Sequence, residues 1–373
     1  MIILFCFIRI FKDKSFLKKR FKMQLAFELS GEHETLPQSE VLACLHALSS
    51  PYAEKMCYKG LLAIDAQLSA EALDTISKRL GMTHFIYEIK GMSKPEEREI
   101  LAVVKNADID NIMEHWHTFA VRVRGKKPPS LERGLEKKAG EIIKRKGYKV
   151  NLTNPSKTFV LLFTKQTCFF CLLLHSVDKK QFEERKPHLR PFFSPGVIMP
   201  KIARALVNLS GVKEKELFLD PFCGTGGILM EAGEIGARVI GIDVQGKMVR
   251  GAEENLGFYG LKGNLIVGDA SKIALRDNSV DAIATDMPYG RSSLISGSCL
   301  TESRYTSLPS SRERLYQDAL DEIHRVLKTR GKAVIVSNSS SFLSRRHDLH
   351  VREKHTYRVH KSLNRYIAVL EKE

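Results

Sequence analysis

Four aspartates in the second half of the chain each close an apolar, strand-like run. They are Asp220, Asp243, Asp269 and Asp286, at the ends of LFLD, ARVIGID, NLIVGD and DAIATD. Because the carboxyl ends of parallel strands meet at one edge of a doubly wound sheet, where ligands bind, these carboxylates are expected to lie together. Any one of them alone could equally be a helix cap. Because four successive strand-like runs end in an aspartate, the pattern favours a binding site whose carboxylates accept hydrogen bonds from hydroxyl and amine groups.

The first aspartate leads into a glycine-rich turn and then a stretch of helical spacing, LFLDPFCGTGGILMEAG. Such a loop lets a ligand lie against the backbone, and free N–H groups at the helix start attract negative charge. Dinucleotides, nucleotide phosphates and S-adenosylmethionine are the candidate ligands. Leu229 stands where a dinucleotide fingerprint needs its third glycine, and no Gly-Lys-Ser/Thr follows. Asp243 can accept both ribose hydroxyls and Asp269 an adenine amino group, which favours S-adenosylmethionine.

These residues resemble two motifs of the S-adenosylmethionine-dependent methyltransferases. The segment 220–227 resembles motif I, and Asp286-Met287-Pro288-Tyr289 resembles the (D/N)PPY motif of amino-methylating members, with Met287 in place of the first proline. The resemblance implies that the Asp286 carboxylate and the Pro288 carbonyl accept the two hydrogens of an exocyclic amine. It implies that Tyr289 stacks on the base.

The same resemblance implies a set of cofactor contacts around the loop and in the preceding FFSPG segment. We expect them to be Asp220, Pro221, Gly224, Thr225, Gly226, Asp243, Asp269, Ala270, Phe193 and Ser194. Core packing is the alternative for the two residues of the FFSPG segment, and no metal site is expected.

Composition favours a folded, reduced protein with a polyanionic partner. The 373 residues are 43% hydrophobic and carry a net charge of +16, with a pI near 9.5. A solvated basic surface would explain the same charge. The seven cysteines follow no disulfide or zinc pattern, which indicates a reducing cytoplasm. We therefore interpret Cys168 and Cys171, the one CxxC pair, as part of a buried strand.

The pattern divides the chain into four parts. Residues 1–22 open with an apolar run too short to span a bilayer, and we expect either a disordered extension or a true translation start at Met23. An α/β region follows over 23–164, then a linker over 165–187 and a doubly wound α/β unit over 188–373. In the last part we expect a helix over 316–331 and a reversed final strand within 360–373.

A basic segment closes the α/β region of the first half. Between Arg122 and Lys149 the sequence has eleven Lys or Arg against three Glu. This density suits phosphate contacts, although Glu and Lys pairs on a solvated helix face are an alternative. TFAVRVR, the helix after it and VNLTNPSKTFVLLF resemble a THUMP domain, an RNA-binding module. The implied RNA contacts are Arg122, Arg124, Lys126, Lys127, Lys144 and Arg145.

One further group interrupts this region, the HWH sequence at His115, Trp116 and His117. Neighbouring side chains of an extended segment point to opposite sides, so the two histidines share a face only in a strand. We expect the single tryptophan to pack structurally rather than to form a site.

Taken together, FELSGE, the THUMP-like segment, FFSPGVIMPKIARALVNL, motif I, DMPYGRSS and HKSLNRY resemble the archaeal tRNA (guanine-10) N2-methyl/dimethyltransferases. The resemblance covers nearly the whole chain from Met23. It implies a THUMP-containing region followed by a Rossmann-like class I methyltransferase domain that methylates a guanine N2 amine in tRNA once or twice.

The resemblance also implies a cytoplasmic enzyme with tRNA as partner and no membrane association, either monomeric or with a small activator subunit. Two other functions stay open at this stage. One is a THUMP-type methyltransferase acting on another tRNA position or on ribosomal RNA. The other is a noncatalytic RNA-binding protein that kept a cofactor fold.

Overall fold

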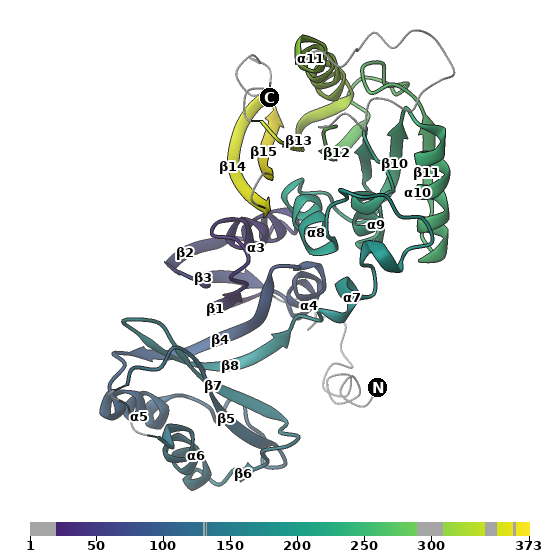
Figure 1. Cartoon of the computed structure of the whole chain (residues 1–373). Coiled ribbons are helices and arrows are strands. Elements are labelled where there is room, and N and C mark those ends of the chain that lie inside the picture. Colours follow the sequence, from purple (N-terminus) through teal and green to yellow (C-terminus); the bar gives the residue numbers. More distant parts are fainter. Residues whose placement is uncertain (1–19, 130, 132, 289–308, 340–348, 361–362) are drawn as a thin grey trace. The chain divides into compact units, whose positions relative to one another are not determined.

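The computed structural model describes residues 20–129, 131, 133–288, 309–339, 349–360 and 363–373 (Figure 1). The chain forms two compact units. Within the described residues, the first comprises 20–31, Ser50–Lys78 and Thr83–Val177, and the second comprises Glu32–Ser49, Arg79–Met82 and 178–373 without the gaps. Among the described residues, no helix is both long and apolar enough to cross a membrane.

The first unit is an eight-stranded mixed sheet with strand order β2-β3-β1-β4-β8-β7-β5-β6. Its elements are β1 (Phe21–Leu29), β2 (Tyr52–Tyr58), β3 (Leu61–Leu68), α4 (Ala70–Arg79, whose last residue belongs to the second unit), β4 (Thr83–Ser93), α5 (Glu97–Asn106), β5 (Thr118–Gly125), α6 (Leu135–Arg145), β6 (Lys149–Val150), β7 (Lys157–Phe163) and β8 (Cys168–Ser176). Helices α5 and α6 cover one face of β5, β7 and β8, where Phe119, Phe159 and Phe170 form the core. The alternate residues of β7 and β8 are also buried on the other face, so these strands are apolar throughout.

The prediction of a linker over 165–187 is wrong for 168–176. Strand β8 occupies this segment and pairs with β4 and β7, because its continuous apolar run is buried on both faces. Cys168 and Cys171 are free thiols inside this strand, which agrees with their interpretation as buried strand residues. Burial raises the pKa of Cys168 to about 12 and that of Cys171 well above its ordinary value, so neither is a reactive thiolate.

The second unit is a seven-stranded sheet with order β11-β10-β9-β12-β13-β15-β14. Its elements are α3 (Leu36–Ala47), α7 (Lys180–Glu183), η1 (Pro187–Leu189), α8 (Pro200–Leu209), β9 (Leu217–Asp220), α9 (Gly227–Glu234), β10 (Arg238–Asp243), α10 (Gly246–Phe258), β11 (Gly263–Val267), β12 (Val280–Asp286), α11 (Pro309–Val326), β13 (Leu327–Ser337), β14 (Leu349–His360) and β15 (Leu363–Lys372). The first five strands in the sheet order are parallel, and β15 and β14 are antiparallel to their neighbours. The doubly wound sheet and its reversed last strand are therefore confirmed.

Both faces of this sheet are buried, as parallel sheets require. Helices α8 and α9 contribute to the core on one face, with Phe218 of β9. Helix α11 contributes to the core on the other face, with Leu219 of the same strand. Consecutive residues of a strand therefore enter opposite cores, and the carboxyl ends of β9, β10 and β12 meet at one edge.

Residues 32–49 and 79–82 also belong to this second unit, whereas the sequence pattern placed them in the α/β region over 23–164. Helix α3 packs against α8, and its Glu40 is fully buried. The Glu40 carboxylate accepts hydrogen bonds from the backbone N–H groups of Gly81 and Met82 and from the side-chain amide of Asn208. Since a buried carboxylate needs such partners, Glu40 fixes α3 and 79–82 to this unit.

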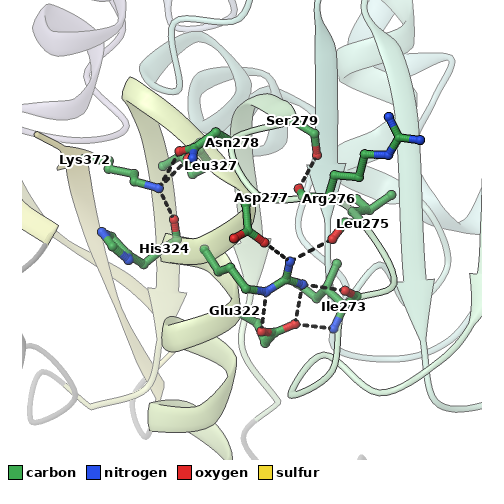
Figure 2. Close-up of polar contacts among 11 residues, drawn as sticks. Ile273, Leu275, Arg276, Asp277, Asn278, Ser279, Glu322, His324, Leu327 and Lys372 are labelled. Atoms are coloured by element: carbon green, nitrogen blue, oxygen red, sulfur yellow. Dashed lines mark hydrogen bonds and ion pairs between the residues drawn. The ribbon is translucent and has the colours of Figure 1, made fainter.

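Two predictions about local structure need correction. Strands β2 and β14 were not expected from the sequence. The helix predicted over 316–331 ends at Val326, where β13 begins. The Lys372 ammonium of β15 donates hydrogen bonds to the carbonyls of His324 and Leu327 and to Asn278 (Figure 2). It satisfies carbonyl groups that a longer helix would have used itself.

Gly241 in β10 offers a test of this packing. A Cβ atom there would lie 2.4 Å from the Leu229 Cδ1, 2.8 Å from the Leu265 Cδ2 and 3.0 Å from the Cys223 Sγ. We expect Gly241→Ala to lower the free energy of unfolding by about 1–3 kcal/mol, because overpacking displaces the β9–α9 connection. Urea unfolding followed by circular dichroism measures this change.

Gly257→Ala is the matched control, because a Cβ there meets nothing within 4 Å and the residue is helical. This variant should raise the free energy of unfolding by about 0.5–1 kcal/mol through helix propensity. Equal effects of the two substitutions would contradict the packing described around β10.

Candidate active site

The glycine loop between β9 and α9 is a tight turn that needs its glycines. Gly224 and Gly226 adopt φ of +50° and +78°, values that favour glycine. A Cβ on Gly226 would lie 3.2 Å from the Ala252 Cβ, so the absence of a side chain also lets α10 approach. The Cys223 N–H donates to the Ile242 carbonyl at 2.9 Å. The loop is thereby fixed to the end of β10.

Asp220 lies beneath this loop and is 1% exposed. One carboxylate oxygen accepts hydrogen bonds from the Thr285 hydroxyl at 2.6 Å and the Phe222 N–H at 3.1 Å. Burial raises the pKa of Asp220 to about 7, and the negative charges of Asp286 and Asp243 act in the same direction. Asp220 therefore stabilises the loop, because its hydrogen-bonded oxygen contacts groups of the protein itself.

Asp243 ends β10 and holds the loop from the side. Its two carboxylate oxygens accept hydrogen bonds from the Gly224 N–H at 3.1 Å and the Gln245 N–H at 2.8 Å. Burial raises the pKa of Asp243, although these two hydrogen bonds oppose the shift. The side chain is half-buried, so it can also face a ligand, as a ribose-binding carboxylate must.

Asp269 follows β11 by two residues and is exposed, with its carboxylate accepting a hydrogen bond from the Ser271 N–H. Ala270 beside it is buried. The chain after them is fixed to α11 by Arg325, whose guanidinium donates to the Ile273 and Leu275 carbonyls and to the Asp277 carboxylate. Figure 2 shows these acceptors around one guanidinium, together with Glu322.

The FFSPG segment is fixed to the glycine loop through Asn255 of α10. The Asn255 amide accepts a hydrogen bond from the Phe192 N–H and donates to the carbonyls of Phe192 and Thr225, each at 2.9 Å. A Cβ on Gly251 would lie 2.0 Å from the Phe192 ring, so this glycine is what lets the ring lie on α10. Phe193 is 53% exposed and Ser194 half-buried, which leaves both able to contact a ligand.

The turn after β12 carries the predicted amine acceptors. The Met287 N–H donates to the Val336 carbonyl at 2.8 Å, and Met287 is fully buried. The Pro288 carbonyl accepts a hydrogen bond from the Tyr316 hydroxyl at 2.6 Å. Asp286 Oδ2 lies 3.2 Å from Arg365 Nη2. Tyr289, the predicted stacking residue, lies outside the described residues.

The structure thus groups most of the predicted cofactor and catalytic residues at one edge of one sheet. Pro221 and Thr225 are buried within the loop, and Asp220, Asp243 and Asp286 are near enough for their charges to interact. Sequence reasoning missed Thr285, Asn255, Tyr316 and Arg365. Arg365 is the last residue of the HKSLNR signature, which was the sequence signal that could have identified it, whereas no sequence signal identified Tyr316.

The predicted RNA contacts all lie in the first unit but differ in exposure. Arg124 is ion-paired with Glu28 at 2.8 Å and lies over the Phe85 ring. Arg122 is exposed and donates to the Leu152 carbonyl. The remaining lysines and arginine are exposed or half-buried: Lys126, Lys127, Lys144 and Arg145.

The prediction that Trp116 packs structurally is wrong. Trp116 is 72% exposed, and its ring lies 6.0 Å from that of His117, measured between the ring centroids. The His117 ring nitrogen accepts a hydrogen bond from the Glu114 N–H at 2.9 Å, which closes the turn that contains Trp116. No group of three or more His, Cys, Asp or Glu side chains able to bind a metal occurs among the residues that the structure describes.

Comparison with known proteins gives consistent matches. The profile of a family described as "RMKL-like, methyltransferase domain" matches residues 187–367. The chain is 35% identical to tRNA (guanine(10)-N2)-dimethyltransferase from Methanothermobacter thermautotrophicus, over 94% of this chain and 100% of that protein. It is 37% identical to the protein of the same name from Pyrococcus abyssi, over 79% and 86%. The crystal structure of TrmN from Thermus thermophilus matches in fold, with a TM-score of 0.53, 20% identity and coverage of 94% and 100%.

The raised pKa of Asp220 predicts a pH-dependent stability. The folded protein keeps this proton up to about pH 7, whereas an unfolded chain releases it near the ordinary value of 3.8. The folded state therefore binds more protons between these values, and this group lowers the free energy of unfolding as the pH rises from about 4 to about 7. Asparagine removes that contribution because it is neutral and keeps the hydrogen-bond acceptor.

As the pH rises from 4 to 7, we expect the free energy of unfolding of Asp220→Asn to increase by about 2–4 kcal/mol relative to that of the unchanged protein. Urea unfolding at a series of pH values measures the difference. If the free energies of unfolding of the two proteins changed with pH in the same way, Asp220 would be ionised in the folded state at neutral pH.

Proposed function

The chain belongs to the tRNA (guanine(10)-N2)-dimethyltransferase family and is an S-adenosylmethionine-dependent tRNA (guanine-N2) methyltransferase; we propose that it acts at guanine-10 and transfers one methyl group and then a second. The observation that carries this proposal is the Asp286–Pro288 turn beside the glycine loop. Its backbone is fixed by Val336 and Tyr316. Positioned acceptors of this kind are what methylation of an aromatic amine requires.

The side chains at this edge of the sheet fit S-adenosylmethionine. When bound, this cofactor supplies a methyl group attached to a positively charged sulfonium. The carboxylates of Asp243 and Asp286 carry negative charge at this edge, since their charges, after burial, help to raise the pKa of Asp220, and negative charge attracts a cation. We propose that Asp243 accepts the ribose hydroxyls, that Asp269 and Ala270 contact the adenine, and that Phe193 and Ser194 contact the methionine end.

Positioning of the guanine amine is the main task of the chain's own residues. The lone pair of this amine is shared with the ring, so the amine is a weak nucleophile until its hydrogens are held. Asp286 and the Pro288 carbonyl accept the two N–H hydrogens, which frees the lone pair and stabilises the positive charge that develops on nitrogen. A carbonyl oxygen has two lone pairs, so Pro288 can accept from Tyr316 and from the amine together. Guanine-10 must leave its stack to reach this turn.

We further propose that the first unit contains a THUMP-type RNA-binding region. Its support is the exposed basic side chains of 122–149 and the tRNA named for the family's members. A cytoplasmic location fits this substrate and the cysteines that are free among the described residues, Cys44, Cys57, Cys168, Cys171 and Cys223. We propose action as a monomer or with a small activator subunit.

The catalytic proposal predicts the behaviour of Asp286 variants. With labelled S-adenosylmethionine and a tRNA transcript, Asp286→Asn should lower kcat by about 100- to 1,000-fold, because it removes the charge that stabilises the methylated amine. The dissociation constant of S-adenosylmethionine, measured by equilibrium dialysis, should stay almost unchanged.

Glu253→Gln on α10, outside the site, is the control for this experiment. Full turnover by Asp286→Asn would remove Asp286 from the mechanism. A parallel loss of cofactor affinity would assign Asp286 to cofactor binding instead.

The exposed Trp116 predicts a stacking contact with RNA. Trp116 lies just before β5, and the strands that pair with the start of β5 carry Lys149 and Lys157. Burial lowers the pKa of the neighbouring His117, and the charge of Lys157 is close enough to lower it further. Stacking of a base on an aromatic ring contributes about 1–3 kcal/mol. We therefore expect Trp116→Ala to weaken tRNA binding by about 5- to 100-fold at fixed salt, with Trp116→Phe close to the unchanged protein. Fluorescence anisotropy measures this, and equal affinity of the alanine variant would exclude a stacking role.

A further inference from the structure

Arg365 is a buried arginine whose contacts join two parts of the active site. It lies on β15, is 4% exposed, and its Nη2 donates to the Gly196 carbonyl at 2.7 Å. The same nitrogen lies 3.2 Å from Asp286 Oδ2. Strand β13 separates β15 from β12 in the sheet, so the side chain has to reach past a whole strand to make the second contact.

Gly196 closes the FFSPG segment, and the other end of that segment is also fixed. Asn255 bonds both the N–H and the carbonyl of Phe192, and Arg365 bonds the carbonyl of Gly196. Phe193 and Ser194, the proposed contacts of the methionine end, lie between these two points. Removal of the Arg365 contact would free one end of a segment that contains an exposed phenylalanine.

Two acceptors on one nitrogen give this arginine a geometric role beyond charge balance. The first acceptor belongs to the segment proposed to face the methyl donor, and the second is the carboxylate proposed to face the amine. Methyl transfer needs the donor carbon and the amine lone pair in line, and a displacement of about 1 Å can cost about 100-fold in rate. A rigid planar guanidinium with several N–H donors is suited to fix both acceptors at once.

We propose that Arg365 is a positioning residue for methyl transfer, which orients the Asp286 carboxylate towards the guanine amine and holds it in register with the FFSPG segment. This inference rests on the function proposed for Asp286. The competing explanation is a purely structural ion pair, since a buried guanidinium needs an acceptor wherever it lies. The two explanations differ in whether the effect of Arg365 passes through Asp286.

A double-mutant cycle separates them. Single-turnover methylation of a tRNA transcript is measured for the unchanged protein, Arg365→Gln, Asp286→Asn and the double variant, at saturating S-adenosylmethionine and tRNA. We expect Arg365→Gln to lower the rate by about 100-fold. The double variant should then match Asp286→Asn within about twofold, because residues that act as a unit are not additive.

Two outcomes overturn the proposal. Multiplied losses in the double variant would show that Arg365 acts independently of Asp286, and an unchanged rate for Arg365→Gln would show no role in the reaction. The unchanged protein tests the proposed function separately, since absence of methylation there counts against that function and not against Arg365.

Matched variants keep the experiment informative. Arg352→Gln on β14 removes an exposed ion pair with Glu371 and should leave the rate unchanged. If a thermal melt shows that Arg365→Gln does not fold, Arg365→Lys takes its place in the cycle. Lysine keeps the charge but not the planar fork, so we expect a rate loss of about tenfold or more with the fold intact. Full activity of Arg365→Lys would contradict a positioning role.

Discussion

The active site depends on keeping three carboxylates close together at one edge of a parallel sheet. Strands β9, β10 and β12 bring Asp220, Asp243 and Asp286 within range of one another's charge, which is unfavourable unless each is compensated. The compensation differs for each group. Asp220 is buried, and its raised pKa keeps it protonated up to about pH 7. Asp243 accepts hydrogen bonds from two backbone N–H groups, and Asp286 forms an ion pair with Arg365. Because Asp220 keeps its proton up to about pH 7, the remaining negative charge is that of Asp243 and Asp286, and it suits a cationic methyl donor.

A second constraint is that the loops bearing the functional groups must be rigid, and α11 supplies much of this. Its Tyr316 hydroxyl bonds the Pro288 carbonyl after β12, and its Arg325 guanidinium bonds the chain that follows Asp269. Lys372 of β15 then donates hydrogen bonds to the carbonyls of His324, near the end of the same helix, and of Leu327, where β13 begins (Figure 2). One helix therefore fixes the loop proposed to contact adenine and the turn proposed to contact guanine. Positioning of this kind needs no movement at the moment of reaction.

Much of this arrangement could be predicted from sequence, because periodicity and the chemistry of strand ends are local signals. The glycine loop, the strand-terminal aspartates and the reversed last strand all follow from such signals. The missed features are tertiary. Arg365 reaches Asp286 and Gly196 from distant positions in the chain, and the attachment of α3 to the second unit depends on Glu40 bonding Gly81 and Met82. The exposure of Trp116 also escaped prediction, because aromatic residues are usually buried and only the surrounding turn shows that this one is not.

The most direct test of the account is to identify the methylated nucleoside. The protein is incubated with S-adenosylmethionine and two tRNA transcripts, one unchanged and one with guanine-10 replaced, and the digested RNA is analysed by mass spectrometry. The account predicts N2-methylguanosine followed by N2,N2-dimethylguanosine in the unchanged transcript and neither in the replaced one. Methylation that survives the replacement would contradict guanine-10 as the target, and a methylated nucleoside other than an N2-guanosine would contradict the amine chemistry assigned to Asp286 and Pro288.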